Sequence, residues 1–220
     1  MHAFYKGKVE VMPKAAIRSL QDFSIWYTPG VAQACLEIEK DKEKAYELTS
    51  KWNYVAVVSD GTRVLGLGDI GGQAGMPVME GKALIFKYLG GVDAFPICLS
   101  TKKVDEIIQT VKWIEPSFGG INLEDFSNPK CFEILDKLRA EMPIPVWHDD
   151  QQGTAAICLA GTINALKLVG KKMNEAKFTL VGTGSANTRT YYVLKSAGVD
   201  PKNIIMVDSK GTIGTYREEL

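Results

Sequence analysis

Hydrophobic and polar positions repeat with two different periods along the chain, and this pattern predicts an α/β fold. Short apolar runs recur from residue 93 onward, and longer stretches with apolar residues three or four positions apart lie between them. The short runs are typical of strands in a parallel sheet, and the longer stretches are typical of amphipathic helices that cross between such strands.

Individual elements follow from the same periods. Strands are expected over residues 6–14, 93–99, 119–123, 144–147, 178–181 and 203–208. Helices are expected over residues 32–51, 78–90, 101–114, 154–169 and 188–197, and from Pro129 onward after an Asn128 cap. Residues 53–69 are interpreted as a hairpin that turns at Asp60-Gly61. Because residues 154–169 are apolar nearly all round, that helix is expected to be buried.

Composition narrows the class of protein. The 220 residues are 45% hydrophobic and 24% charged, and 26 basic residues balance 26 acidic ones, which argues against an extended nucleic-acid surface. No apolar run is long enough for a membrane span, and the first eleven residues lack the apolar region typical of a signal peptide. The four cysteines lack CxxC spacing and suit free thiols in a reducing cytosol, so a cytoplasmic protein with no membrane partner is expected.

A glycine-rich stretch over residues 63–82 is the first candidate for chemistry. Glycine lets backbone approach a ligand closely, so this loop is interpreted as presenting Arg63 and Lys82 to a small anionic substrate. A purely structural loop is the alternative. If Lys82 lies near the start of the helix expected after Pro77, the helix dipole opposes its charge and favours loss of its proton.

Two acidic pairs form the second candidate. Glu124-Asp125 and Asp149-Asp150 each follow a short expected strand directly. Carboxyl ends of parallel strands meet at one edge of a sheet, where α/β proteins bind ligands. Carboxylates gathered there suit a hard divalent cation, Mg²⁺ or Mn²⁺, whereas either pair alone is more typical of a helix cap or a solvated loop.

The third candidate is GTGSAN, residues 182–187, between an expected strand and an expected helix. It fits the dinucleotide fingerprint G-x-G-x-x-G/A except that Asn187 takes the third glycine position, which is expected to weaken helix–strand packing. Asp208 ends the next strand, where a ribose-binding carboxylate belongs, and Lys210 nearby leaves NAD and NADP both open. Dinucleotide contacts are expected at Gly182, Gly184, Ser185, Ala186, Asn187 and Asp208. The chain is therefore divided into an α/β substrate and metal domain, residues 1–162, and the start of a Rossmann-type domain, residues 163–220.

Several motifs together resemble the malic enzymes, most closely the smaller bacterial and archaeal type. They lie, in family order, at residues 27–32, 64–87, 93–99, 122–126 and 148–155. The resemblance implies oxidation of (S)-malate by NAD or NADP, decarboxylation to pyruvate and CO₂, dependence on Mg²⁺ or Mn²⁺, and a homodimer.

The same resemblance implies roles for three residues in catalysis and substrate binding. Lys82 is implied as the general base and Tyr27 as the general acid that protonates the enolpyruvate carbon, and Tyr27 could be supplied by the neighbouring subunit. Arg63 is implied as a clamp on a malate carboxylate.

The resemblance also implies the metal site. Glu124, Asp125 and Asp150 are implied as ligands, and Asp149 as a residue that orients them or Lys82. The family's nucleotide domain continues well beyond its second strand, so a truncated chain is expected, with residues 177–220 poorly soluble alone. Metal-dependent oxaloacetate decarboxylation without redox turnover, and a catalytically incomplete fragment or regulatory module, are the alternatives.

Overall fold

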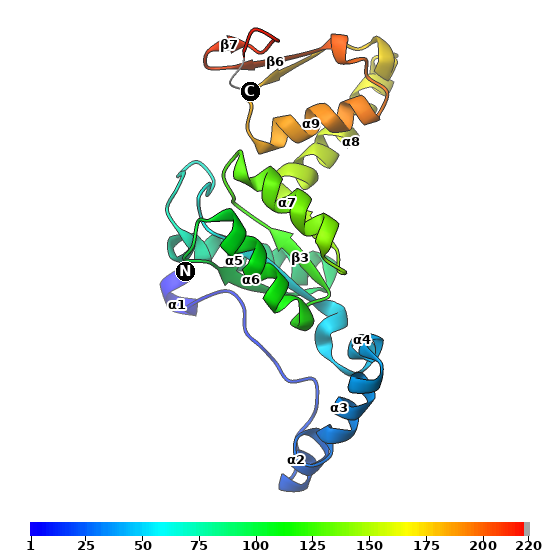
Figure 1. Ribbon diagram of the computed structural model, residues 1–220. Coiled ribbons are helices and arrows are strands. Elements are labelled where there is room, and N and C mark those ends of the chain that lie inside the picture. The colour runs from blue at the N-terminus through cyan, green and yellow to red at the C-terminus, as the bar shows by residue number, and fades with distance from the viewer. Residues whose placement is uncertain (218–220) are drawn as a thin grey trace.

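Two separate sheets, each flanked by helices, follow an N-terminal arm in the computed structural model, which describes residues 1–217 (Figure 1). The first sheet is fully parallel, with strand order β2-β1-β3-β4. Its strands are β1 (Tyr54–Ser59), β2 (Asp93–Cys98), β3 (Gly120–Leu123) and β4 (Val146–His148). The expected α/β class and parallel pairing are confirmed.

Helices cover both faces of this sheet. Helix α5 (Gly72–Gly90) packs on β1 and β2, and α6 (Val104–Ile114) and α7 (Lys130–Glu141) lie against each other on the other face (Figure 1). Right-handed crossovers require this placement, because the chain moves in opposite directions along the sheet before and after β2. The inner face of α7 belongs to the core, since four side chains there are completely buried: Cys131, Ile134, Leu135 and Leu138.

The expected hairpin over residues 53–69 is wrong. Strand β1 is apolar on both faces, with Ala56, Val57 and Val58 fully buried, and lies between β2 and β3, which leaves no free edge for a hairpin partner. The chain after β1 forms a loop closed by one isolated bridge between Val64 and Gly68. Gly61 has a φ of +66° and accepts hydrogen bonds from two backbone N–H groups further along this loop.

Helix α5 begins earlier than the sequence predicted. It starts at Gly72 and includes Pro77, whereas a start after Pro77 was expected. Lys82 consequently lies in the middle of the helix, so the proposed opposition between its charge and the helix dipole does not apply, because that effect is confined to the end turns.

The N-terminal arm differs most from expectation. Residues 6–14 form no strand, and the expected helix over 32–51 is broken into α3 (Val31–Lys40), a 3₁₀ turn (Lys42–Lys44), α4 (Ala45–Leu48) and a second 3₁₀ turn (Ser50–Asn53). The break comes at Asp41, whose side chain accepts a hydrogen bond from the backbone N–H of Glu43 and caps a new turn. Two short helices were missed, α1 (His2–Tyr5) and α2 (Leu20–Trp26).

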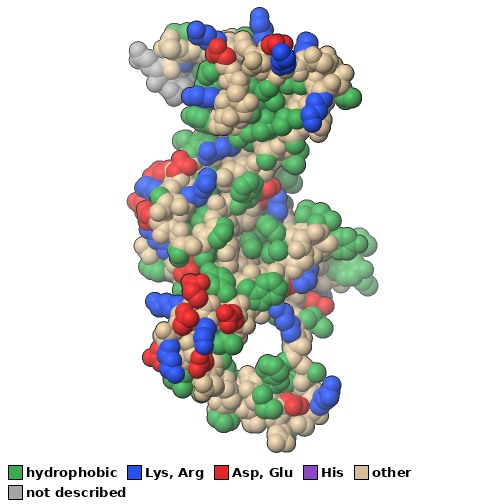
Figure 2. Space-filling view, turned by 90° about the vertical axis from the view of Figure 1, so that its right-hand side faces the viewer, with side chains coloured by type: hydrophobic (Ala, Val, Ile, Leu, Met, Phe, Trp, Pro, Cys, Tyr) green, Lys and Arg blue, Asp and Glu red, His purple; other side chains and the backbone are tan. Residues whose placement is uncertain are grey.

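A second sheet is formed by β5 (Phe178–Val181), β6 (Ile204–Asp208) and the unpredicted β7 (Gly211–Thr212), with α9 (Ser185–Ser196) beside it. The second sheet and α9 form the C-terminal lobe, and helix α8 (Thr154–Leu168) leads into it. The expected burial of α8 is wrong: Ala155 is buried, but Ile157 is 74% exposed. Figure 2 shows hydrophobic side chains gathered on the surface of the lobe. Val181, at the end of β5, is 77% exposed. Among residues 1–217, no helix is long and apolar enough to cross a membrane.

The core under α7 generates a stability prediction. Leu135→Ala should lower the free energy of unfolding by about 2–5 kcal/mol, because it leaves a cavity where a fully buried side chain packed. Arg139→Ala, at an exposed position of the same helix, should change it by about 0.5 kcal/mol or less. Urea-induced unfolding measures both, and equal effects would contradict the described packing.

Candidate functional site

The candidate site lies where the first sheet reverses its winding direction. From β1 the chain crosses to β2, and from β2 it crosses back over β1 to β3. Ligands bind beyond the carboxyl ends of the strands at such a reversal. Residues 124–125 follow β3 directly and residues 149–150 follow β4, which pairs with β3. Strand pairing therefore brings the two acidic pairs to one edge of the sheet.

Lys82 of α5 joins the two acidic pairs. Its side chain is 21% exposed, and its Nζ lies 3.0 Å from Oε1 of Glu124 and donates a hydrogen bond of 2.8 Å to Oδ2 of Asp149. Burial alone would lower the pKa of Lys82, but the hydrogen bond to Asp149 and the charge of Glu124 outweigh it, and the pKa is raised. In this arrangement Lys82 holds its proton more tightly, contrary to expectation.

The carboxylates here carry more negative charge than Lys82 offsets. Burial, and then the charge of Asp150, raises the pKa of Glu124 to about 7 and that of Asp125 to about 6. Burial also raises the pKa of Asp150. Neighbouring His148 is completely buried, and burial lowers its pKa to about 4, so it is neutral and supplies no compensating charge at neutral pH.

The chemistry of these residues fits a hard divalent cation. The donors are carboxylate oxygens, which Mg²⁺ and Mn²⁺ prefer, and Oδ2 of Asp125 is buried without a hydrogen-bond partner. Across the described residues, however, no three or more His, Cys, Asp or Glu side chains gather as a group that could hold a metal ion. Like charges repel, and Lys82 attracts Glu124, so the carboxylate oxygens of Glu124, Asp125 and Asp150 do not converge on one point. To bind a cation, these carboxylates would have to turn towards one another.

The backbone of Asp125 ties the acidic cluster together. Its φ of 57° is uncommon for a residue other than glycine, and such conformations concentrate at functional sites. Its N–H donates to Oδ2 of Asp150 at 2.8 Å, and its C=O accepts from the N–H of Arg63 at 3.0 Å. Thus Asp125 connects the β4 turn with the loop after β1.

Arg63 is close to the cluster but does not clamp it. Its side chain is exposed, and Nη1 donates to the backbone C=O of Leu65 at 2.9 Å. Its charge still lowers the pKa of Asp125 and Asp150 slightly, against the larger effect of burial. An exposed guanidinium at the rim of an acidic cluster is free to turn towards an anionic ligand.

A buried ion pair behind the loop was missed by sequence reasoning. The carboxylate of Asp60 is completely buried, pairs with Nζ of Lys130 from α7, and accepts from the Thr62 hydroxyl at 2.6 Å. That hydroxyl in turn accepts from the N–H of Ser127 at 3.0 Å. This network fixes the loop that carries Arg63 against the segment after Asp125. The Asp60-Gly61 dipeptide was interpreted as the turn of a hairpin, and nothing else in the sequence marked Asp60 as a buried partner of Lys130.

Tyr27 is not in this cluster. It follows α2, which lies at the far end of the arm, well separated from the first sheet (Figure 1), and its side chain is 70% exposed. A tyrosine at the cluster would therefore have to come from elsewhere, such as Tyr27 of a second copy of the chain.

The glycine turn before α9 has the geometry of a dinucleotide-binding turn. Gly182 has a φ of +99° and Gly184 is the N-cap residue, so the N–H groups of Ser185, Ala186 and Asn187 lie in the first helical turn. The Asn187 amide donates to the C=O groups of Val181 at 2.8 Å and Gly182 at 3.1 Å. Asn187 thus closes the turn with its side chain, which the sequence had marked only as weakened packing.

Two neighbours of this turn also differ from expectation. Asn128 does not cap α7; its amide donates to the C=O of Thr183 at 2.8 Å and joins the two lobes. Asp208 lies at the end of β6 as expected, but Arg217 donates to both of its oxygens, at 3.2 and 2.9 Å. The hydrogen bonds from Arg217 lower the pKa of Asp208.

Comparison with known proteins identifies the family. The model for the malic enzyme N-terminal domain matches residues 6–103 and 100–139, and that for the malic enzyme NAD binding domain matches residues 151–220. The chain belongs to the malic enzyme family.

Individual relatives agree with this assignment. An NAD-dependent malic enzyme of Geobacillus stearothermophilus is 57% identical over 97% of this chain and 44% of its own length. An NADP-dependent malic enzyme of Escherichia coli is 47% identical over 96% of this chain and 28% of its own. The crystal structure of the Pyrococcus horikoshii malic enzyme superposes with a TM-score of 0.90 and 57% identity, covering 92% of this chain and 47% of that one. The chain thus spans half or less of the length of these malic enzymes.

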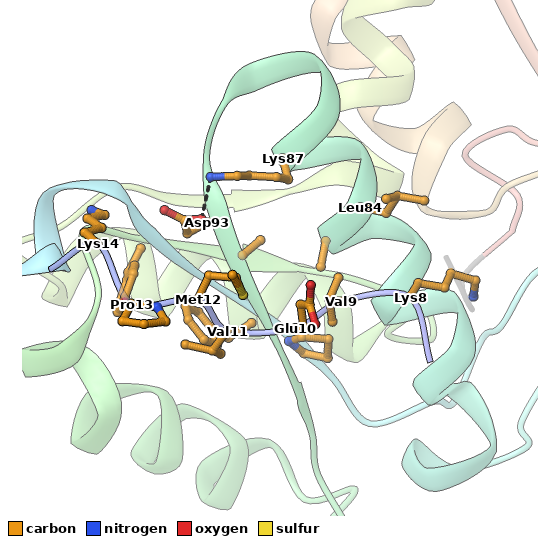
Figure 3. A pocket seen from close by; sticks show the side chains of 15 residues that line it. Lys8, Val9, Glu10, Val11, Met12, Pro13, Lys14, Leu84, Lys87 and Asp93 are labelled. Carbon is orange, nitrogen blue, oxygen red and sulfur yellow. Dashed lines mark hydrogen bonds and ion pairs between the residues drawn. The ribbon is translucent and has the colours of Figure 1, made fainter. Parts of the chain in front are cut away.

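A cavity lies apart from the acidic cluster. It measures about 480 Å³ and is bounded by residues 8–14 of the arm, α5 and β2 (Figure 3). The ion pair between Lys87 and Asp93 lies at its edge, with 2.7 Å between Nζ and Oδ1. The arm contributes four apolar side chains, those of Val9, Val11, Met12 and Pro13, and three charged ones, so the lining mixes apolar and charged groups.

The pair between Lys130 and Asp60 generates a second prediction. Lys130→Met should lower the free energy of unfolding by about 3–5 kcal/mol, because it leaves a buried carboxylate without its counter-charge. Adding Asp60→Asn should restore part of this loss. Lys137→Met, which removes an exposed lysine of the same helix, should cost about 1 kcal/mol or less. Urea unfolding of the four proteins is the measurement, and similar costs for the two lysine variants would rule out a structural role for the buried pair.

Proposed function

We propose that this protein oxidises (S)-malate with NAD or NADP and decarboxylates the product to pyruvate and CO₂. The observation that carries the proposal is the contact of Lys82 with carboxylates from two neighbouring strand ends, Glu124 and Asp149, in a chain that also has a dinucleotide-type turn. The names of the relatives, NAD- and NADP-dependent malic enzymes, support the same activity.

Glu124, Asp125 and Asp150 are the residues that would hold Mg²⁺ or Mn²⁺. The raised pKa values of Glu124 and Asp125 and the unpartnered Oδ2 of Asp125 support this assignment. A cation held by these residues would supply Lewis acidity towards the malate hydroxyl and the carbonyl formed from it. Asp149 stays on Lys82 and orients its Nζ.

Lys82 is proposed as the base that accepts the hydroxyl proton of malate. Glu124 and Asp149 hold its proton in the described arrangement. Turning Glu124 away from Lys82 removes part of that stabilisation, so the amine becomes less basic when the carboxylates rearrange. Arg63 is proposed to turn from the Leu65 carbonyl to a carboxylate of malate, which it can bind with two parallel hydrogen bonds.

Tyr27 is proposed as the acid that protonates the enol carbon, supplied by a second copy in a homodimer. Its exposure and its distance from the cluster along the arm support a role across a subunit boundary. The dinucleotide is proposed to bind at Gly182, Gly184 and residues 185–187, with its ribose at Asp208, where Arg217 would have to make room or contact a 2′-phosphate.

Domain organisation and compartment follow from the same proposal. The boundary between substrate and nucleotide domains is placed at residue 162, within α8. The four cysteines are free thiols, which supports a cytoplasmic location because a reducing compartment keeps thiols unpaired.

The test is formation of reduced nicotinamide, followed by absorbance, with malate, Mn²⁺ and NAD⁺ or NADP⁺. Lys82→Ala should lower the rate by ~10²–10⁴-fold, the usual contribution of a proton-transfer group. Lys87→Ala, an exposed lysine of the same helix, should leave the rate within about twofold. If added oxaloacetate is decarboxylated but malate gives no reduced nicotinamide, the protein is a decarboxylase instead. An unchanged rate in Lys82→Ala would show that Lys82 is not the base.

A further inference from the structure

Helix α9 touches the acidic turn through one arginine. The turn is a π-helical segment, Asp149–Gly153, that follows β4 directly. Nη2 of Arg189, on α9, donates a 3.0 Å hydrogen bond to Oε1 of Gln151 in the middle of this turn. The contact therefore joins the helix that begins at the glycine turn to the segment that carries Asp149 and Asp150.

Gln151 transmits this contact to the body of the first domain. Its side chain is completely buried, and its Nε2 donates to the C=O of Cys131 on α7 at 3.0 Å. Both ends of the amide are thus engaged, one by each lobe. A buried amide held at both ends fixes the backbone around it, because an unmade hydrogen bond there costs about 1–3 kcal/mol.

Arg189 is energetically unfavourable at this position if it serves packing alone. Its side chain is 21% exposed, its Nε is buried without a hydrogen-bond partner, and its nearest carboxylate, that of Asp136, is 3.9 Å away. Its guanidinium lies 6.0 Å from the centre of the Phe132 ring. Partial burial of a charge with incomplete pairing is unfavourable, so the arginine is better explained by what it holds in place.

The turn that Gln151 fixes has little freedom of its own. A Cβ at Gly153 would lie 2.2 Å from Oδ1 of Asp149, so the Asp149 carboxylate is packed against the end of the turn. The other carboxylate oxygen holds Lys82, and Asp150 accepts the Asp125 N–H. A shift of Gln151 therefore displaces the groups around Lys82 and the proposed metal ligands together. π-Helical turns of this kind recur at functional sites.

At the other end, Arg189 follows Gly184 by five positions in the same helix. Five residues of helix move together as a rigid unit. A ligand that displaces the N-terminus of α9 therefore also displaces Arg189. The hydrogen bond from Asn128 to Thr183 places the glycine turn itself against the segment after β3.

We propose that Arg189 is a positioning residue that couples dinucleotide binding at the glycine turn to the arrangement of the Asp149-Asp150 turn, through Gln151. The inference rests on the proposed function, since it needs both a dinucleotide and a divalent cation to bind. Coupling of this kind is reciprocal: the dinucleotide must change the affinity for the cation by the same factor as the cation changes that for the dinucleotide.

The test is a pair of calorimetric Mn²⁺ titrations of the protein, with and without saturating NAD⁺. NAD⁺ should change the Mn²⁺ dissociation constant by about 5-fold or more, within the usual range of such coupling. In Arg189→Ala the ratio should fall to about one, while each ligand alone still binds. Lys195→Ala, which removes an exposed positive charge from the same helix, should keep the wild-type ratio.

A second measurement needs no metal. Amide hydrogen exchange of residues 148–154 should slow on addition of NAD⁺ in the wild type and in Lys195→Ala, but not in Arg189→Ala. A retained coupling ratio in Arg189→Ala, or a wild-type ratio of one with both ligands bound, overturns the coupling role and leaves the proposed function standing. If wild type binds neither ligand, the proposed function itself fails, and the coupling role with it.

Discussion

The ammonium of Lys82 compensates carboxylates that reach one sheet edge from two neighbouring strands, and the arrangement of the site depends on this ion pair. Without a cation there, Glu124, Asp125 and Asp150 would place several negative charges in a buried space, which the raised pKa values of Glu124 and Asp125 already reflect. Lys82 comes from α5, on the opposite face from α7. The pair thus requires the reversal of winding that places α5 and α7 on opposite faces.

Around this pair, three further contacts set the geometry. The buried pair of Asp60 and Lys130 holds the loop of Arg63, the backbone of Asp125 joins that loop to Asp150, and Gln151 joins the acidic turn to α9. Each contact links segments that follow different strands. Because the contacts share neighbours, their effects on stability and on ligand binding are not expected to be additive.

Much of this could be read from the sequence, and the failures have physical causes. Strand ends followed by acidic pairs predicted where Glu124 and Asp150 would lie, because parallel strands share an edge. Asp60-Gly61 was misread because a hairpin signal is local, whereas the burial of β1 on both faces is a property of the whole sheet. The role of Arg189 had no local signal, since it depends on how two lobes pack.

Anomalous scattering from Mn²⁺ in crystals of the protein would show which carboxylates hold the cation. We expect one strong peak in contact with carboxylate oxygens of Glu124, Asp125 and Asp150, with Lys82 close by but no longer paired with Glu124. A peak at another part of the surface, or those three carboxylates directed away from one another with Mn²⁺ bound elsewhere, would contradict this expectation.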